Sequence, residues 1–89
     1  MQQKHLIIKG KVQGVWYRGS MFEQAILLDI VGWVRNLDDG SVEAVVQGEP
    51  ENIEKIIAWA KQGPENAEVS EVLVQEVDED VLPSFKVAP

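Results

Sequence analysis

The 89-residue sequence predicts an α+β fold, a two-layer sandwich in which two helices cover one face of an antiparallel sheet. Segments with strand-like patterning alternate with two amphipathic segments in the order β-α-β-β-α-β. Two helices in so short a chain can both bury their apolar stripes only when they share one face of the sheet. With 45% apolar and 26% charged residues, the composition is that of an ordinary globular chain. We therefore expect a single domain over residues 1–89.

The first strand is expected over residues 5–11, whose centre is β-branched and almost continuously apolar, as in a buried central strand. The first helix is expected to begin at Ser20, because Ser20 and Glu23 match the capping-box pattern S-x-x-E. It is expected to end at Asp29, a residue type that tolerates left-handed backbone. Arg18 would then stand two residues before the helix cap.

Further strands are expected over residues 32–36, 41–47 and 69–77, with a short edge strand over residues 84–87. Asp39-Gly40 is a strong signal for a hairpin between the second and third strands. Pro50 suits the first turn of the second helix, and Gly63-Pro64 is expected to end that helix. This order of elements is the ferredoxin-like split βαβ arrangement, in which the first and third strands lie centrally.

The net charge of −7 argues against nucleic acid as a partner, because that affinity depends on neutralising phosphates with Lys and Arg. The lack of aromatic pairs at RNA-binding spacing points the same way. The charges are unevenly distributed: residues 1–22 hold four basic and no acidic residues, and the remainder holds four basic against all 15 acidic residues. A small anion would therefore bind most favourably in the first quarter of the chain.

Several other classes of protein are not expected. The chain has no cysteines, which excludes disulfides, thiol nucleophiles and cysteine-ligated metals, and its single histidine, His5, does not make a metal site. No segment approaches the roughly 18 apolar residues that span a membrane, and the N-terminus lacks the apolar core of a signal peptide. We expect a cytoplasmic monomer. Ile26 and Leu27 exceed the apolar face that their helix needs, so they should be partly exposed or contact another chain.

A glycine-containing segment from Gly10 to Arg18 separates the first strand from the first helix. Such a turn can aim backbone N–H groups at one point, and a guanidinium can complete the shell around an anion. Asn36, at the end of the second strand, is expected beside this loop. Taken alone, an arginine before a helix is usually a surface residue, and an asparagine beside a turn usually serves the turn. The combination with the glycine loop favours a functional site.

The chain resembles the acylphosphatases in three pieces that follow in order. They are Gly10-x-Val12-Gln13-Gly14-Val15-x-Tyr17-Arg18; Gly32-Trp33-Val34-Arg35-Asn36 followed by Asp39-Gly40-Ser41-Val42-Glu43 and Gln47-Gly48; and Gly63-Pro64 before a valine-rich strand. The match covers nearly the whole chain. Trp16 stands where a glycine is common and is expected to reshape the rim of the loop. Asp29 replaces a common helix-ending glycine.

The resemblance implies hydrolysis of the carboxyl–phosphate bond of small acyl phosphates to a carboxylate and inorganic phosphate, without metal, cofactor or covalent intermediate. By the matching motifs, Arg18 would be the catalytic arginine and Asn36 the catalytic asparagine. The backbone of the phosphate loop would bind the phosphoryl group; its residues are Gln13, Gly14, Val15, Trp16, Tyr17 and Arg18. Inorganic phosphate or sulfate would compete for this place.

The chemistry of these residue types agrees with that implication. Phosphoryl transfer from a good leaving group asks mainly for positioning and charge stabilisation. Arg18 can grip two phosphoryl oxygens, and the neutral amide of Asn36 can orient a water molecule. Arg35 alternates to the other face of the sheet and is expected to be structural. Tyr17 is expected to pack beneath the loop and Trp16 to flank the acyl group.

One alternative of another class remains open. The same scaffold can serve as a catalytically silent module that binds phosphate or carbamoyl phosphate within a larger maturation protein. The presence of both Arg18 and Asn36 favours the enzyme.

Overall fold

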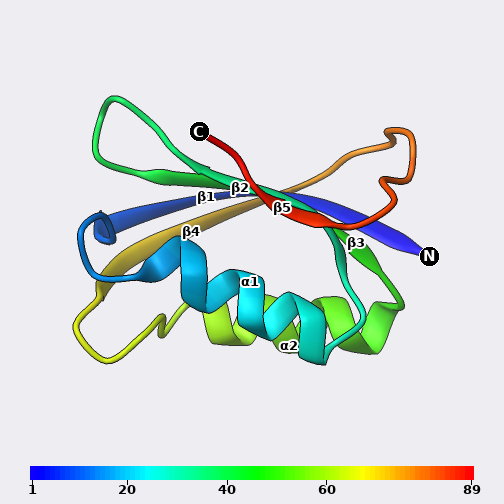
Figure 1. The fold of residues 1–89 in the computed structure, drawn as a ribbon, viewed down its shortest axis with the longest axis horizontal. Coiled ribbons are helices and arrows are strands. Elements are labelled where there is room, and N and C mark those ends of the chain that lie inside the picture. Colours follow the sequence, from blue (N-terminus) through cyan, green and yellow to red (C-terminus); the bar gives the residue numbers. More distant parts are fainter.

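The structure is a computed structural model that describes residues 1–89, and both helices lie on one face of the sheet (Figure 1). Along the chain, the elements are β1 (Gln2–Lys11), α1 (Tyr17–Leu27), β2 (Val31–Asn36), β3 (Val42–Gly48), α2 (Pro50–Ala60), β4 (Glu68–Glu76) and β5 (Phe85–Val87). The predicted α+β architecture is confirmed. Neither helix is long and apolar enough to span a membrane.

The five strands lie in the order β4-β1-β3-β2-β5, so β1 and β3 are both internal, as predicted. Neighbouring strands are antiparallel except for β2 and β5, which are parallel. The predicted antiparallel sheet of four strands is confirmed, and the predicted short edge strand, whose direction the sequence did not indicate, runs parallel to β2. The reason is the route of the chain: β4 ends beside the beginning of β1, and the next segment crosses to the opposite edge and starts β5 beside the beginning of β2.

Alternation along the strands places the apolar core between the sheet and the helices. The core residues come from both helices, from four of the five strands and from the connecting loops: Leu6, Ile8, Val12, Tyr17, Met21, Ala25, Ile30, Val34, Val42, Ala44, Val46, Ile53, Ile56, Ala60 and Phe85. The edge strand β4 adds Val69 and Val72, which are only half-buried against this core. Each element thus buries one face against the others.

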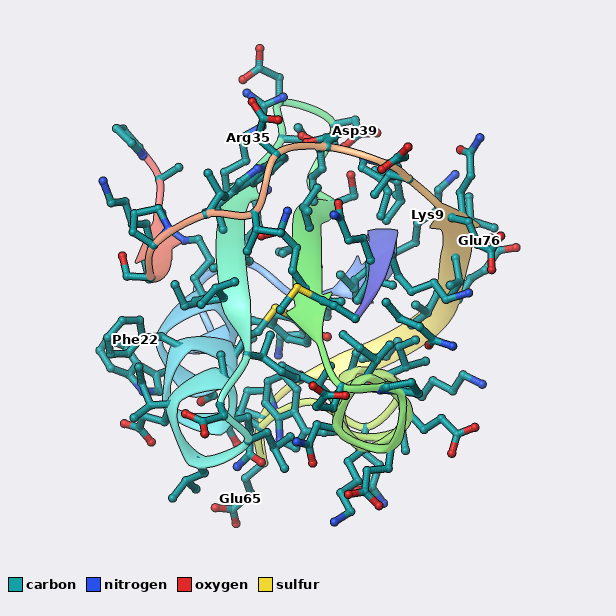
Figure 2. The ribbon with its side chains drawn as sticks, turned by 90° about the vertical axis from the view of Figure 1, so that its right-hand side faces the viewer. Lys9, Phe22, Arg35, Asp39, Glu65 and Glu76 are labelled. Carbon is teal, nitrogen blue, oxygen red and sulfur yellow. The ribbon has the colours of Figure 1, made fainter.

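Residues 77–84 cross the face of the sheet that the helices leave open (Figure 2). Gln47 is fully buried beneath this segment, where its amide nitrogen donates to Asp80 O at 3.0 Å and its amide oxygen accepts from the backbone N–H of Leu82 at 2.9 Å. Gln3 donates to Glu79 O at 2.8 Å. The acidic side chains here are exposed, as predicted, but the backbone of the segment is tied to the sheet.

The first helix begins one turn earlier than predicted. The residue before α1 is Trp16, which has left-handed backbone (φ 66°) and makes no side-chain capping bond. The N–H of Ser20 already donates to Trp16 O at 3.0 Å, so Ser20 lies inside the helix and the predicted capping box with Glu23 is wrong. Arg18 therefore lies in the first turn rather than before it. At the other end, Asp29 has the left-handed backbone that was predicted (φ 55°).

Candidate active site

A cleft of about 640 Å³ opens at one end of the molecule. The loop before α1, the hairpin between β2 and β3 and the loop between α2 and β4 all lie at this end (Figure 1). The lining residues are Val12, Gln13, Gly14, Val15, Trp16, Tyr17, Arg18, Gly19, Asn36, Asn66 and Val87. The fold thus brings together all the site residues that the sequence predicted, including Arg18 and Asn36, which are 18 positions apart in the chain.

The backbone N–H groups of residues 13–19 have no hydrogen-bond acceptor within the chain. Those of residues 17–19 belong to the first turn of α1, where a helix offers donors that it cannot satisfy itself. Gly14 (φ 74°) and Trp16 (φ 66°) are both left-handed. When left-handed and right-handed backbone conformations alternate in a loop before a helix, the N–H groups of the loop and of the first helical turn form a concave group of donors. Such a group favours binding of an anion.

Arg18 brings the only basic side chain to this cleft. It is half-buried, and its Nη1 donates to the backbone oxygen of Ala88 at 3.4 Å. Ala88 in turn donates its N–H to Val34 O at 2.8 Å, which fixes the C-terminal segment to β2. The guanidinium therefore lies between the helix and this segment, with its remaining donors available to a ligand.

Asn36 has the one buried side-chain polar atom in the structure that lacks a hydrogen-bond partner, its amide oxygen Oδ1. Buried acceptors are nearly always satisfied, so an unpaired one needs an explanation. This oxygen belongs to a residue that lines the same cleft as the free N–H groups. An unpaired acceptor and unpaired donors on residues that line one cleft suit a small polar ligand.

The side chain of Gln13 ties the loop to the hairpin that follows Asn36. Its Nε2 donates to Leu37 O at 2.8 Å and to Ser41 O at 2.9 Å. Leu37 and Ser41 also close the hairpin, since Leu37 N donates to Ser41 O at 2.9 Å. One amide thus fixes the distance between the group of donors and Asn36.

Tyr17 supports the loop from below, as predicted. Its ring is buried against Trp59, with 5.3 Å between the ring centroids, and its hydroxyl donates to Ala60 O at 2.8 Å. A Cβ at Gly63 would lie 2.8 Å from the Tyr17 ring, so this position needs glycine for space as well as for its φ of 70°. Burial raises the pKa of the Tyr17 hydroxyl well above its usual value.

Arg35 lies on the other side of the sheet from the helices (Figure 2). Its Nε donates to Glu43 at 2.6 Å, and its guanidinium stands 5.4 Å from the centroid of the Trp33 ring. Glu43 also pairs with His5 Nε2 at 2.8 Å. The prediction that Arg35 points away from Asn36 is confirmed.

Sequence reasoning missed four contributions to this end of the molecule. Gly19, one residue beyond the predicted loop, lines the cleft and adds a free N–H group. Asn66 and Val87 line the cleft from distant parts of the chain, and neither stands in a pattern that would have indicated it. The Gln13 side chain was also missed, because only its backbone was expected to act. A polar residue next to Gly14 in an otherwise apolar run was the one available signal.

A family model described as Acylphosphatase matches residues 4–87. An acylphosphatase of Thermococcus kodakarensis is 52% identical over 83 residues, which are 93% of this chain and 91% of that protein. Among solved structures, an acylphosphatase from Coxiella burnetii is similar with a TM-score of 0.94 and 38% identity, over 98% of this chain and 92% of that chain.

A larger protein contains a similar unit. Full-length HypF, in its phosphate- and nucleotide-bound form, matches 99% of this chain with a TM-score of 0.87 and 28% identity, but the match is only 12% of that chain. The match to the family model and the identity to relatives of the same length decide the assignment. This chain belongs to the acylphosphatase family and is a hydrolase.

Proposed function

We propose that this acylphosphatase hydrolyses small acyl phosphates by a mechanism in which the loop of residues 13–18 and Arg18 bind the phosphoryl group and Asn36 orients the attacking water. Water attacks phosphorus, the bond between phosphorus and the acyl oxygen breaks, and the carboxylate leaves with the bonding electron pair. The products are a carboxylate and inorganic phosphate. The leaving group is already weakly basic, so no residue has to protonate it.

Binding of the phosphoryl group rests on the unpaired donors. The N–H groups of residues 13–19 lack acceptors in the chain and belong to residues that line one cleft. Three phosphoryl oxygens can accept from several such donors, and the positive end of α1 favours their charge. Arg18 adds a guanidinium, which can donate two parallel hydrogen bonds to phosphoryl oxygens. These groups stabilise charge that develops as the carboxylate departs.

The single observation that carries the role of Asn36 is the buried, unpaired Oδ1 of a residue that lines the same cleft as these donors. A water molecule that donates one proton to Oδ1 would have its lone pair free for phosphorus. Because an amide cannot take up the proton near neutral pH, we assign the proton to a phosphoryl oxygen, which balances the reaction. No histidine or carboxylate lines the cleft, so the rate should be nearly flat between about pH 5 and pH 8.

The roles are tested by Arg18→Gln and Asn36→Ala, with benzoyl phosphate as substrate, a chelator present, and phosphate binding measured by calorimetry. We expect Arg18→Gln to lose both turnover and phosphate binding. Asn36→Ala should lose turnover by about 100-fold or more while phosphate still binds, because only the water is misplaced. Near-normal turnover in Asn36→Ala would contradict the water-orienting role.

Matched controls separate these effects from general damage. Arg35→Gln removes an arginine from the opposite face of the sheet, and Asn52→Ala removes an asparagine from α2; neither residue lines the cleft. Both controls should keep wild-type turnover. If the wild-type protein bound phosphate but hydrolysed no acyl phosphate, a catalytically silent phosphate-binding module would replace the enzyme mechanism.

We propose further that inorganic phosphate or sulfate competes with substrate, and that residues 1–89 act as one domain and as a monomer. Each helix and strand packs against one core, which supports the single domain. Ile26 and Leu27 are 57% and 78% exposed, so light scattering across a concentration series tests the monomer directly. A cytoplasmic location remains a prediction from the sequence.

A further inference from the structure

Trp16 combines two properties that are unfavourable for a tryptophan. Its backbone is left-handed (φ 66°), a conformation that a bulky side chain rarely adopts. Its side chain is also 68% exposed, although indole is among the largest apolar groups. A glycine would suit this backbone without strain. The presence of a large aromatic side chain here therefore calls for a role beyond the turn itself.

The indole ring is held in place by Gly19. A Cβ built at Gly19 would lie 2.4 Å from Cε2 of the Trp16 ring and 2.5 Å from its Cζ2, distances that real atoms do not reach. The ring therefore packs directly against the backbone of the first turn of α1. One part of the ring is covered by Gly19, and the rest is open at the lip of the cleft.

The lip of the cleft continues the apolar character of this ring. Val87, which is 43% exposed, lines the same cleft from the edge strand β5, and Asn66 adds a polar side chain from the loop after α2. The deep wall is closed, because Val12 and Tyr17 are each only 1% exposed. A group attached to a phosphoryl held by residues 13–18 must therefore leave the cleft past its lip.

The size of the cleft supports a second occupied region. Its volume of about 640 Å³ is in the range of about 300–1,000 Å³ that holds a drug-sized ligand, far more than a phosphoryl group fills. The space beyond the donors is bordered by an aromatic ring and a valine. An apolar substituent in this space would be stabilised, because its surface and the apolar surface of these two side chains would both be removed from water.

We propose that Trp16, with Val87, forms a subsite for the acyl group, and that this protein prefers aromatic acyl phosphates to acetyl phosphate. This inference rests on the proposed function, since it uses the same phosphoryl position. The subsite leaves the chemistry unchanged: the phosphorus–oxygen bond breaks and the aromatic group departs as its carboxylate. Because the contact is the same in substrate and transition state, it should act mainly on KM.

The test compares benzoyl phosphate with acetyl phosphate in the wild-type protein, Trp16→Gly and Trp16→Phe. Trp16→Gly keeps the backbone N–H and suits the left-handed φ. We expect it to raise KM for benzoyl phosphate about three- to tenfold more than it raises KM for acetyl phosphate, which is the worth of an aromatic contact. Trp16→Phe should restore most of the preference. Leu27→Ala, which removes an exposed apolar side chain of α1 outside the cleft, is the matched control.

A binding measurement separates this inference from the proposed function. Benzylphosphonate and methylphosphonate carry the same anionic head, and their dissociation constants are measured by calorimetry without any turnover. The wild-type protein should bind benzylphosphonate more tightly, and Trp16→Gly should lose that difference. If the two ligands bound equally to the wild-type protein, or if Trp16→Gly weakened both alike, Trp16 would serve only to shape the loop and the inference would be wrong.

Discussion

At the residue scale, Gln13 joins the two halves of the site. The phosphate loop follows β1, and Asn36 is the last residue of β2. The Gln13 amide donates to two backbone oxygens of the hairpin, those of Leu37 and Ser41, and so sets their separation. Because displacement of a positioned group by about 1 Å can cost about 100-fold in rate, this contact should matter for catalysis as well as for stability.

Gln13→Ala should therefore lower kcat by about 10- to 100-fold and the free energy of unfolding by roughly 1–3 kcal/mol, since two hydrogen bonds between the loop and the hairpin are lost. Steady-state kinetics and urea unfolding measure the two effects. Gln62→Ala, at an exposed glutamine in the loop after α2, is the control and should change neither. A loss of stability with unchanged kcat would show that Gln13 supports the fold but does not position Asn36.

At the scale of one element, α1 begins without a side-chain cap. A helix start leaves four N–H groups without partners, and most helices satisfy one of them with Ser, Thr, Asp or Asn. Here Trp16 stands in that position and makes no such bond, so the free groups remain available to an anion. Ser20 resembles a cap in sequence but lies one turn inside the helix.

Ser20→Ala distinguishes these two placements. If Ser20 capped the helix, its replacement by alanine would lower the free energy of unfolding by about 1 kcal/mol. If Ser20 lies inside the helix, the replacement should leave the free energy of unfolding unchanged or raise it slightly, because alanine favours helix. We expect the second result in urea unfolding. Ser41→Ala is the contrasting variant, since Ser41 is buried and its hydroxyl donates to Asp39 at 2.5 Å; it should destabilise the protein by roughly 1–2 kcal/mol. A loss of about 1 kcal/mol in Ser20→Ala would contradict the early start of α1.

At the scale of the whole molecule, an ion-pair network joins three strands on the face opposite the helices. Glu43 of β3 accepts from Arg35 of β2 at 2.6 Å and pairs with His5 of β1 at 2.8 Å. Burial opposes ionisation of Glu43, but the hydrogen bonds from His5 and Arg35 outweigh it and hold the pKa of this carboxyl below its usual value. The contribution of this network to the free energy of unfolding therefore depends on pH.

The sign of this linkage follows from the lowered pKa. Ionised Glu43 stabilises the fold above its unfolded pKa of about 4.5, and this contribution is lost as pH falls through the lower folded pKa. Glu43→Gln should be less stable at pH 7 by roughly 1–3 kcal/mol, and the difference should shrink below about pH 4. Thermal unfolding between pH 3 and pH 7 measures it. Glu71→Gln, at an exposed glutamate of β4 that forms no ion pair, should follow the wild-type curve; a constant difference for Glu43→Gln would contradict the assignment.

The sequence predicted most of the fold because its signals are local. Alternation marks the strands, Asp39-Gly40 marks the hairpin, and Pro50 and Gly63 bound α2, each through backbone preferences that hold wherever the residues lie. The left-handed end of α1 at Asp29 follows for the same reason. The amphipathic patterns also predicted that both helices pack on one face of the sheet, because in so short a chain both apolar stripes can be buried only there.

By itself, then, the sequence determined the order of the elements, the internal position of β1 and β3, and the two motifs that carry Arg18 and Asn36. Only the tertiary structure decided the parallel edge strand, the unpaired oxygen of Asn36, and the packing of Trp16 on Gly19. The physical reason is that these features depend on distances between segments far apart in the chain. Local patterns specify the conformation of a segment, but hydrogen-bond satisfaction and packing are properties of the assembled whole.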